Sequence, residues 1–134
     1  DDVFLAPESM TAAVKEFCKK SGEEVPESAG ALAAVIYKSL AACYGKTVKE
    51  LEAITGKTYP SVNVVGGGSN AEYLNQLTAD FTGKTVYAGP GEATAIGNLL
   101  AQMMAAGEFD GLKAAREAVY QSFAVKAYGP KRVR

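Results

Sequence analysis

Three consecutive glycines, Gly66-Gly67-Gly68, constrain the fold of this chain more than any other feature. They follow the short β-branched segment 61–65 and precede the apolar helical pattern of residues 70–82, so they mark a turn from a strand into a helix. Glycine has no Cβ, which lets such a turn adopt positive φ and lets a ligand approach the backbone closely. Unpaired N–H groups at the start of a helix carry partial positive charge. The turn therefore predicts a corner that suits a phosphate or the face of a nucleoside.

The same turn also has a purely structural interpretation, in which Ser69 or Asn70 is the N-cap of a helix that follows at once. Three glycines are more than such a turn needs, so we favour a binding role to which these two polar side chains contribute. A P-loop is excluded because no Gly-x-x-x-x-Gly-Lys-Ser/Thr motif occurs. The dinucleotide fingerprint is matched in its glycine spacing only, because no acidic residue ends the following strand.

Hydrophobic periodicity divides the chain into helices and two short strands. We expect helices that begin at Ser9 and Ser28, the second continuing either as one long helix or as two joined near Gly45. A strand, a helix, a strand at 85–87 and another helix follow, which predicts two parallel strands joined by a right-handed crossover. Such a sheet is too small to stand alone, so we infer that it pairs with strands outside this chain. The expected organisation is α/β and helix-rich, with a helical segment over 1–60, a βαβα unit over 61–125 and a tail over 126–134.

The second glycine-containing turn, residues 88–98, leads into a helix whose first turns carry small side chains. Ala93, Ala95 and Gly97 allow another backbone to approach, and Glu92 complements the helix dipole. We expect close backbone packing here rather than contact with a ligand.

Composition excludes several classes of chemistry. The chain has no histidine, which rules out Ser-His-Asp and Cys-His nucleophile systems and histidine-containing zinc sites. Its net charge of −1 predicts neither nucleic acid nor an acidic membrane as a partner, and no apolar run is long enough for a membrane span. Cys18 and Cys43 each lie on the apolar side of a helical pattern, which predicts free thiols and a cytoplasmic location. From the opening Asp1-Asp2, without Met, we expect a processed, truncated or excised piece of a longer protein.

Three segments together carry a resemblance to a known family. They are Val65-Gly66-Gly67-Gly68-Ser69, Leu74-Asn75-Gln76-Leu77-Thr78-Ala79-Asp80 and Ala88-Gly89-Pro90-Gly91-Glu92-Ala93-Thr94-Ala95-Ile96-Gly97-Asn98. Over nearly its whole length the chain resembles the C-terminal domain of the FGGY carbohydrate kinases, and within them the rhamnulokinase branch. The resemblance implies part of one lobe of an actin-like, ribonuclease-H-like ATPase fold. It also implies transfer of the γ-phosphoryl group of ATP to a sugar hydroxyl with Mg²⁺, which in that branch converts L-rhamnulose to L-rhamnulose 1-phosphate.

The resemblance places the glycine turn against the ADP moiety. By position it implies nucleotide contact first at Gly67, with Gly66 and Gly68 beside it, and further contacts from Ser69 and Asn70.

One departure from the family concerns the adenine contact. Many members carry Asn at the third residue after the glycines, where this chain has Ala71, and its own asparagine, Asn70, comes one residue earlier. A shift by one helix position turns a side chain by about 100°. Whether Asn70 replaces the usual adenine contact is therefore left open.

The resemblance also implies that the catalytic machinery is incomplete in this chain. The aspartate base, the phosphate loop and most sugar contacts of the family belong to an N-terminal lobe, so we assign no catalytic residue and no metal ligand here. Asp80 is not expected to replace that base, because it lies late in a helix. The isolated chain is expected to bind nucleotide weakly, if at all, and to catalyse nothing. Two alternatives remain: a kinase of this family for another sugar, and a non-catalytic nucleotide-binding or assembly module.

Overall fold

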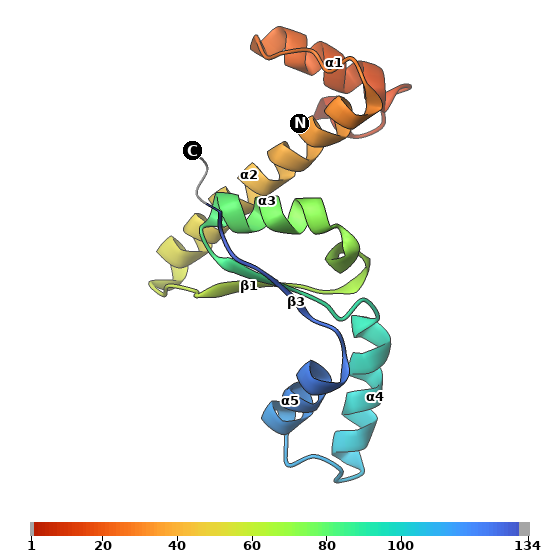
Figure 1. The fold of residues 1–134 in the computed structure, drawn as a ribbon, viewed down its shortest axis with the longest axis vertical. Helices are drawn as coiled ribbons and strands as arrows, with labels where there is room; N and C mark the ends of the chain where they lie inside the picture. The colour runs from red at the N-terminus through yellow and green to blue at the C-terminus, as the bar shows by residue number, and fades with distance from the viewer. Residues whose placement is uncertain (1, 132–134) are drawn as a thin grey trace. The chain divides into compact units, whose positions relative to one another are not determined.

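The computed structural model describes residues 2–131, and the chain divides into two compact units, Asp1–Leu40 and Ala41–Arg134. Helix α2 runs across this division, so its first part belongs to the first unit and its last part to the second. The elements, in chain order, are η1 (Asp2–Phe4), α1 (Met10–Ser21), α2 (Ala29–Thr55), β1 (Ser61–Val64), η2 (Gly66–Asn70), α3 (Glu72–Thr82), β2 (Thr85–Ala88), α4 (Ala93–Ala105), α5 (Leu112–Ser122) and β3 (Lys126–Tyr128), where η denotes a 3₁₀ helix (Figure 1).

In the first unit, local chemistry sets the bounds of α1. The hydroxyl of Ser9 accepts a hydrogen bond from the N–H of Ala12, and Gly22 ends the helix in the left-handed conformation with φ 74°. Val14 and Cys18 are the buried residues of α1. The expected start of this helix at Ser9 and the buried position of Cys18 are thereby confirmed.

Helix α2 is continuous through Gly45, so the alternative of one long helix is correct. Ser28 accepts a hydrogen bond from the N–H of Ala31 at its start, and Gly56 follows its last turn with φ 64°. A Cβ at Gly45 would lie 2.9 Å from the carbonyl oxygen of Phe81, so glycine there permits close approach to α3 without interrupting α2. Cys43 is exposed, contrary to the expectation that it lies on a buried side of this helix.

The sheet has three strands rather than two. Strands β1 and β2 are parallel, as predicted, with Ser61 opposite Thr85. Strand β3 pairs antiparallel with β2, with Ala127 opposite Tyr87. Residues 126–128 were expected to belong to the tail, and the prediction of only two strands was wrong. Three residues carry too little periodicity to indicate a strand, and this one forms because it meets the edge of β2. Residues 132–134 of the expected basic tail lie outside the described residues.

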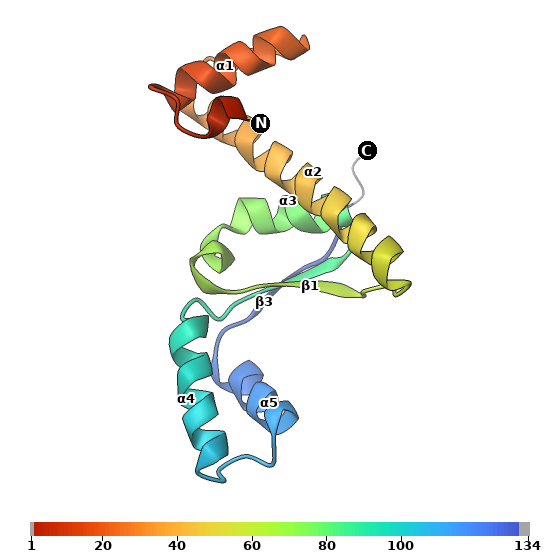
Figure 2. The ribbon, with the colours of Figure 1, turned by 180° about the vertical axis from the view of Figure 1, so that it is seen from behind.

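The two faces of the sheet carry different helices, and the side chains of each strand point to these faces in alternation. Figures 1 and 2 show α3 on one face and α4 and α5 on the other. Val86 and Ala88 are buried on the α3 side, whereas Asn63 and Tyr87 line a hollow that α4 and α5 complete.

The packing of α3 differs from the apolar pattern that we expected. Tyr73 and Phe81 are 50% and 44% exposed, while Asn75, Thr78 and Ala79 are the buried residues of this helix. The helix therefore packs through its smaller residues on a sheet in which Val86 and Ala88 are buried. Within the described part of the chain, no helix has the length and apolar character needed to cross a bilayer.

Candidate functional site

The glycine turn forms its own short 3₁₀ helix, Gly66–Asn70, before α3 begins at Glu72. We expected the α-helix to follow the glycines at once, from about Asn70. Ala71 holds the N-cap position of α3, without a side-chain cap hydrogen bond. The structural alternative in which Ser69 or Asn70 caps the helix is therefore wrong.

The turn is tied to the second turn at the carboxyl ends of β1 and β2. The N–H of Gly66 donates to the carbonyl oxygen of Pro90 at 3.0 Å, and the N–H of Gly89 donates to that of Val64 at 2.9 Å. Gly66 has φ 74°, a conformation that non-glycine residues rarely adopt. Glycine is thus required at position 66 by the path of the backbone.

Gly67 and Gly68 have no comparable structural reason. Neither lies in the left-handed region, and a Cβ added at Gly67 would meet no atom within 4 Å. A Cβ added at Gly68 would lie 3.8 Å from Cγ1 of Val64, which is an ordinary contact. The packing of the described chain would therefore accept side chains at both positions. The missing Cβ atoms leave space that a ligand could occupy.

The N–H of Gly67 is the open donor of this turn. The first two N–H groups of a 3₁₀ helix have no acceptor inside the helix. Of these two, the N–H of Gly66 is bound by Pro90, while that of Gly67 makes no backbone hydrogen bond beyond the helices and strands described here. Gly67 itself is exposed. The turn thus combines a free N–H with open space, an arrangement that suits an anionic or polar ligand atom.

Ser69 and Asn70 take different places around the turn. Ser69 is buried, and its hydroxyl donates to the carbonyl oxygen of Gly66 at 2.7 Å. Asn70 is exposed, with Nδ2 3.9 Å from where a Cβ of Gly91 would lie. The Ser69 hydroxyl is therefore used inside the turn, whereas the Asn70 amide lies beside the second turn.

A small hollow of about 150 Å³ separates the two turns and is bordered by Glu72 and Lys126. These two side chains form an exposed ion pair between the start of α3 and β3. The pair lowers the pKa of Glu72 and raises that of Lys126, so both groups are charged at neutral pH and compensate each other. Sequence reasoning missed Lys126, because no local signal places residue 126 beside the glycine turn.

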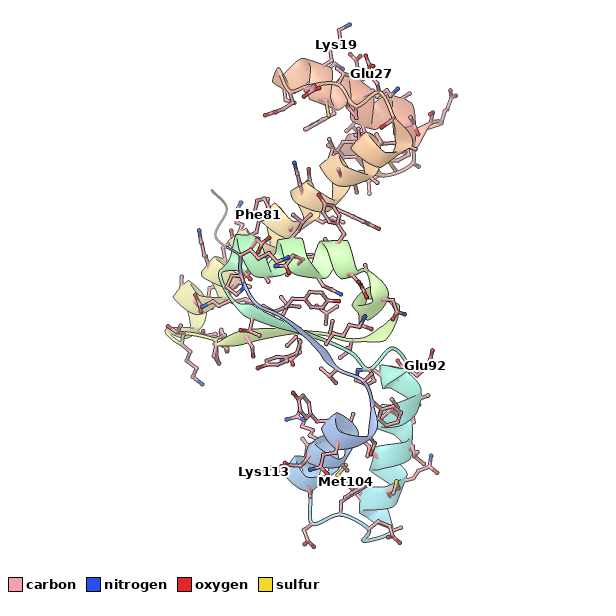
Figure 3. The ribbon with its side chains drawn as sticks, viewed as in Figure 1. Lys19, Glu27, Phe81, Glu92, Met104 and Lys113 are labelled. Atoms are coloured by element: carbon pink, nitrogen blue, oxygen red, sulfur yellow. The ribbon has the colours of Figure 1, made fainter. Side chains whose placement is uncertain are left out.

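Close backbone packing in the second turn occurs at Gly89, before the helix start at which it was expected. A Cβ at Gly89, which has φ 127°, would lie 2.5 Å from the carbonyl oxygen of Ala124. At Gly97 it would meet nothing within 4 Å, so no described residue packs closely there. Glu92 is exposed at the N-cap position of α4, where Figure 3 labels it, and makes no side-chain cap hydrogen bond.

A larger hollow of about 800 Å³ lies on the opposite face of the sheet from α3. Its walls come from β1, β2, α4 and α5, with Arg116 and Tyr120 among the lining residues. None of the three glycines lines it, but Val65, which directly precedes them, does. No cluster of three or more His, Cys, Asp or Glu side chains that could hold a metal ion occurs among residues 2–131.

The sequence of residues 2–106 matches the family described as the FGGY family of carbohydrate kinases, C-terminal domain. The chain belongs to this family. It is 48% identical over 131 residues to the rhamnulokinase of Bacillus subtilis, a match that covers 98% of this chain and 27% of that protein. The rhamnulokinases of Halalkalibacterium halodurans and Enterococcus faecalis are 48% and 46% identical over 96% of this chain, which corresponds to 27% and 26% of their lengths.

These matches confirm the family inferred from the glycine turn and its neighbouring segments. The chain spans about a quarter of the length of the curated relatives that it matches. As a C-terminal FGGY domain, it presents two linked turns at the carboxyl ends of parallel strands, and the first of them offers the N–H of Gly67. In open α/β sheets, ligands bind at this edge.

Proposed function

We propose that the chain is the nucleotide-binding part of a cytoplasmic, ATP-dependent sugar kinase that converts L-rhamnulose to L-rhamnulose 1-phosphate. The substrate follows the printed name of relatives that are up to 48% identical over nearly the whole chain. The observation that carries the nucleotide assignment is Gly67. Its N–H has no backbone acceptor outside the described helices and strands, and its missing Cβ leaves space that the fold does not use.

In this proposal ADP or ATP lies across the turn, with its closest approach at Gly67. Gly66 sets the direction of the chain through its positive φ and its hydrogen bond to Pro90. Because Gly68 has no Cβ, no side chain projects beside Gly67. Ser69 stabilises the turn from inside. Asn70 lines the small hollow beside the second turn, and a contact with the adenine would come from there.

Phosphoryl transfer itself needs groups that this chain is not proposed to supply. The reaction depends on positioning and on charge stabilisation from both sides of the γ-phosphate, with Mg²⁺ bridging phosphate oxygens. Glu72, the acidic residue that borders the turn, is already bound by Lys126. We therefore propose a two-lobed, actin-like enzyme in which an N-terminal lobe supplies the base, and an isolated chain that is inactive.

Titration with ADP tests the nucleotide assignment in the chain itself. We expect ADP to shift the amide resonances of Gly66–Asn70 in ¹⁵N-labelled protein, and Gly67→Leu to abolish the shifts while leaving the fold intact. Gly30→Leu is the matched control, since a Cβ there approaches only the Ser28 hydroxyl, at 4.0 Å. If Gly67→Leu binds ADP as the unmodified chain does, the nucleotide role of the turn is wrong.

A chimera separates the kinase proposal from a non-catalytic module. Replacing the matched 131-residue segment of the B. subtilis rhamnulokinase with this chain should preserve ATP-dependent phosphorylation of L-rhamnulose. Introducing Gly67→Leu into the chimera should raise the KM for ATP more than the KM for the sugar. A folded chimera that binds ADP but transfers no phosphate would favour the non-catalytic module.

A further inference from the structure

We propose that Asn75 is a positioning residue for the nucleotide site, because its buried amide fixes the turn that offers the N–H of Gly67. This inference rests on the nucleotide role proposed for the glycine turn. It concerns a residue that lies on α3 behind the turn rather than on the surface that a nucleotide would touch.

The glycine turn cannot hold its own conformation firmly. A 3₁₀ helix has poorer hydrogen-bond geometry than an α-helix and is stable only in short pieces. Three of the five residues in Gly66–Asn70 are glycines, which lose more backbone freedom on folding than other residues. A turn of this composition needs contacts from outside to remain in one conformation.

Two buried polar side chains provide these contacts. The Ser69 hydroxyl donates to the carbonyl oxygen of Gly66 at 2.7 Å, which closes the turn on itself. Nδ2 of Asn75 donates to the carbonyl oxygen of Ser69 at 2.9 Å, and this hydrogen bond is buried. Gly67 lies between the two carbonyl groups that are held, so its N–H is oriented by both.

Asn75 joins this turn to a rigid element. It belongs to the first turns of α3, where its own N–H donates to the carbonyl oxygen of Ala71 at 2.9 Å. Its side chain is 2% exposed, although asparagine favours neither burial nor a helix interior. A buried amide is stable only when its hydrogen bonds are made, and the bond to Ser69 gives this one a specific role.

The chemistry of the contact determines the substitution that tests it. Asn75→Asp keeps the shape of the side chain but replaces the NH₂ donor with an oxygen that faces the Ser69 carbonyl oxygen. Asn75→Ala removes the contact without adding a charge. Thr78→Val is the matched control, because Thr78 is equally buried on α3 and its hydroxyl bonds only within that helix, to Leu74.

The test measures two properties of each variant of the full chain: amide hydrogen exchange of Gly66–Asn70, and the dissociation constant for ADP from NMR titration. We expect Asn75→Asp and Asn75→Ala to speed exchange in the turn and to weaken ADP binding about tenfold, because ADP would then have to order the turn, at a cost similar to that of one buried hydrogen bond. Thr78→Val should change neither property. If the Asn75 variants do not fold, Ser69→Ala breaks the adjoining bond to Gly66 and is read by the same two measurements.

Each outcome decides a separate point. Unchanged exchange in the turn of a folded Asn75→Asp variant would show that Asn75 does not position it. Faster exchange with unchanged ADP affinity would show that it holds the turn for a structural reason alone. If neither the unmodified chain nor the chimera responds to ADP, the proposed function of the turn fails, while exchange still decides whether Asn75 holds its conformation.

Discussion

The Nζ atom of Lys84 lies 2.7 Å from Oε1 of Glu52, although 32 residues separate the two in the sequence. The same carboxylate oxygen accepts the N–H of Tyr59 at 2.8 Å. Both charged side chains are largely withdrawn from solvent, at 16% and 22% exposure. One carboxylate thus joins the last turns of α2 to the segment before β1 and to the residue before β2.

This arrangement predicts a pH-dependent contribution to stability. Hydrogen bonds from Lys84 and from the N–H of Tyr59 lower the pKa of Glu52 from its ordinary value of 4.5. A depressed carboxyl pKa stabilises the fold above the unfolded-state pKa, and this stabilisation is lost as the pH falls through the folded-state pKa. Glu52→Gln should therefore reduce stability at neutral pH and make the loss of stability below pH 4.5 shallower.

Urea unfolding at a series of pH values checks this prediction. Glu50→Gln is the control on the same helix, because Glu50 makes only an exposed pair with Lys46, at 3.7 Å. Curves of stability against pH that run parallel for the unmodified chain and Glu52→Gln would contradict the assigned role.

Two glycines of α2 should respond with opposite signs to the same substitution. Gly45→Ala places a Cβ 2.9 Å from the carbonyl oxygen of Phe81, and overpacking of this kind destabilises by about 1–3 kcal/mol. Gly30→Ala meets only the Ser28 hydroxyl at 4.0 Å and should stabilise by about 0.5–1 kcal/mol through helix propensity. Urea unfolding of both variants measures the difference. Equal effects would mean that α2 does not approach α3 at Gly45.

Gly89 should be the least replaceable glycine of the second turn. Gly89→Ala must adopt φ 127° and place its Cβ 2.5 Å from the carbonyl oxygen of Ala124. We expect a loss of about 2 kcal/mol or more, since strain and overlap act together. Gly97→Ala, with open space around its Cβ, should be neutral or stabilising. Thermal unfolding distinguishes the two, and similar melting temperatures would contradict the close packing at Gly89.

A hydrogen-bond network on α3 should control the end of the described chain. Nε2 of Gln76 donates to Oδ1 of Asp80 and to the carbonyl oxygen of Gly129, each at 2.9 Å. The same Asp80 oxygen accepts the N–H of Lys131 at 2.7 Å. Gln76→Glu replaces the donor with a carboxylate that faces two acceptors, so it should loosen the segment that follows β3.

Amide hydrogen exchange of β3 and proteolysis after Lys126 measure this loosening. We expect both to become faster in Gln76→Glu, because β3 is an edge strand of three residues with few other contacts. Gln121→Glu, on the exposed surface of α5, is the control and should leave both rates unchanged. Unchanged rates in Gln76→Glu would show that pairing with β2 alone holds β3.

Local chemistry within a few residues determined much of this structure. Ser9 and Gly22 bound α1 through hydrogen bonds and a left-handed conformation that need no distant partner. The β-branched segment, the glycines and the helical pattern after them predicted a strand, a turn and a helix in the right order. These segments, together with residues 88–98, indicated the family, which the comparisons then confirmed.

The tertiary structure decided what depends on residues far apart in the chain. Strand β3 exists because residues 126–128 meet the edge of β2. Three residues are too few to show a periodicity that would predict this strand. Only the packed turn shows that Gly66 is required for its backbone while Gly67 lies beside open space. The burial of Asn75 also depends on the tertiary structure. A side chain is buried by the residues that surround it in space, whereas the sequence shows only its neighbours along the chain.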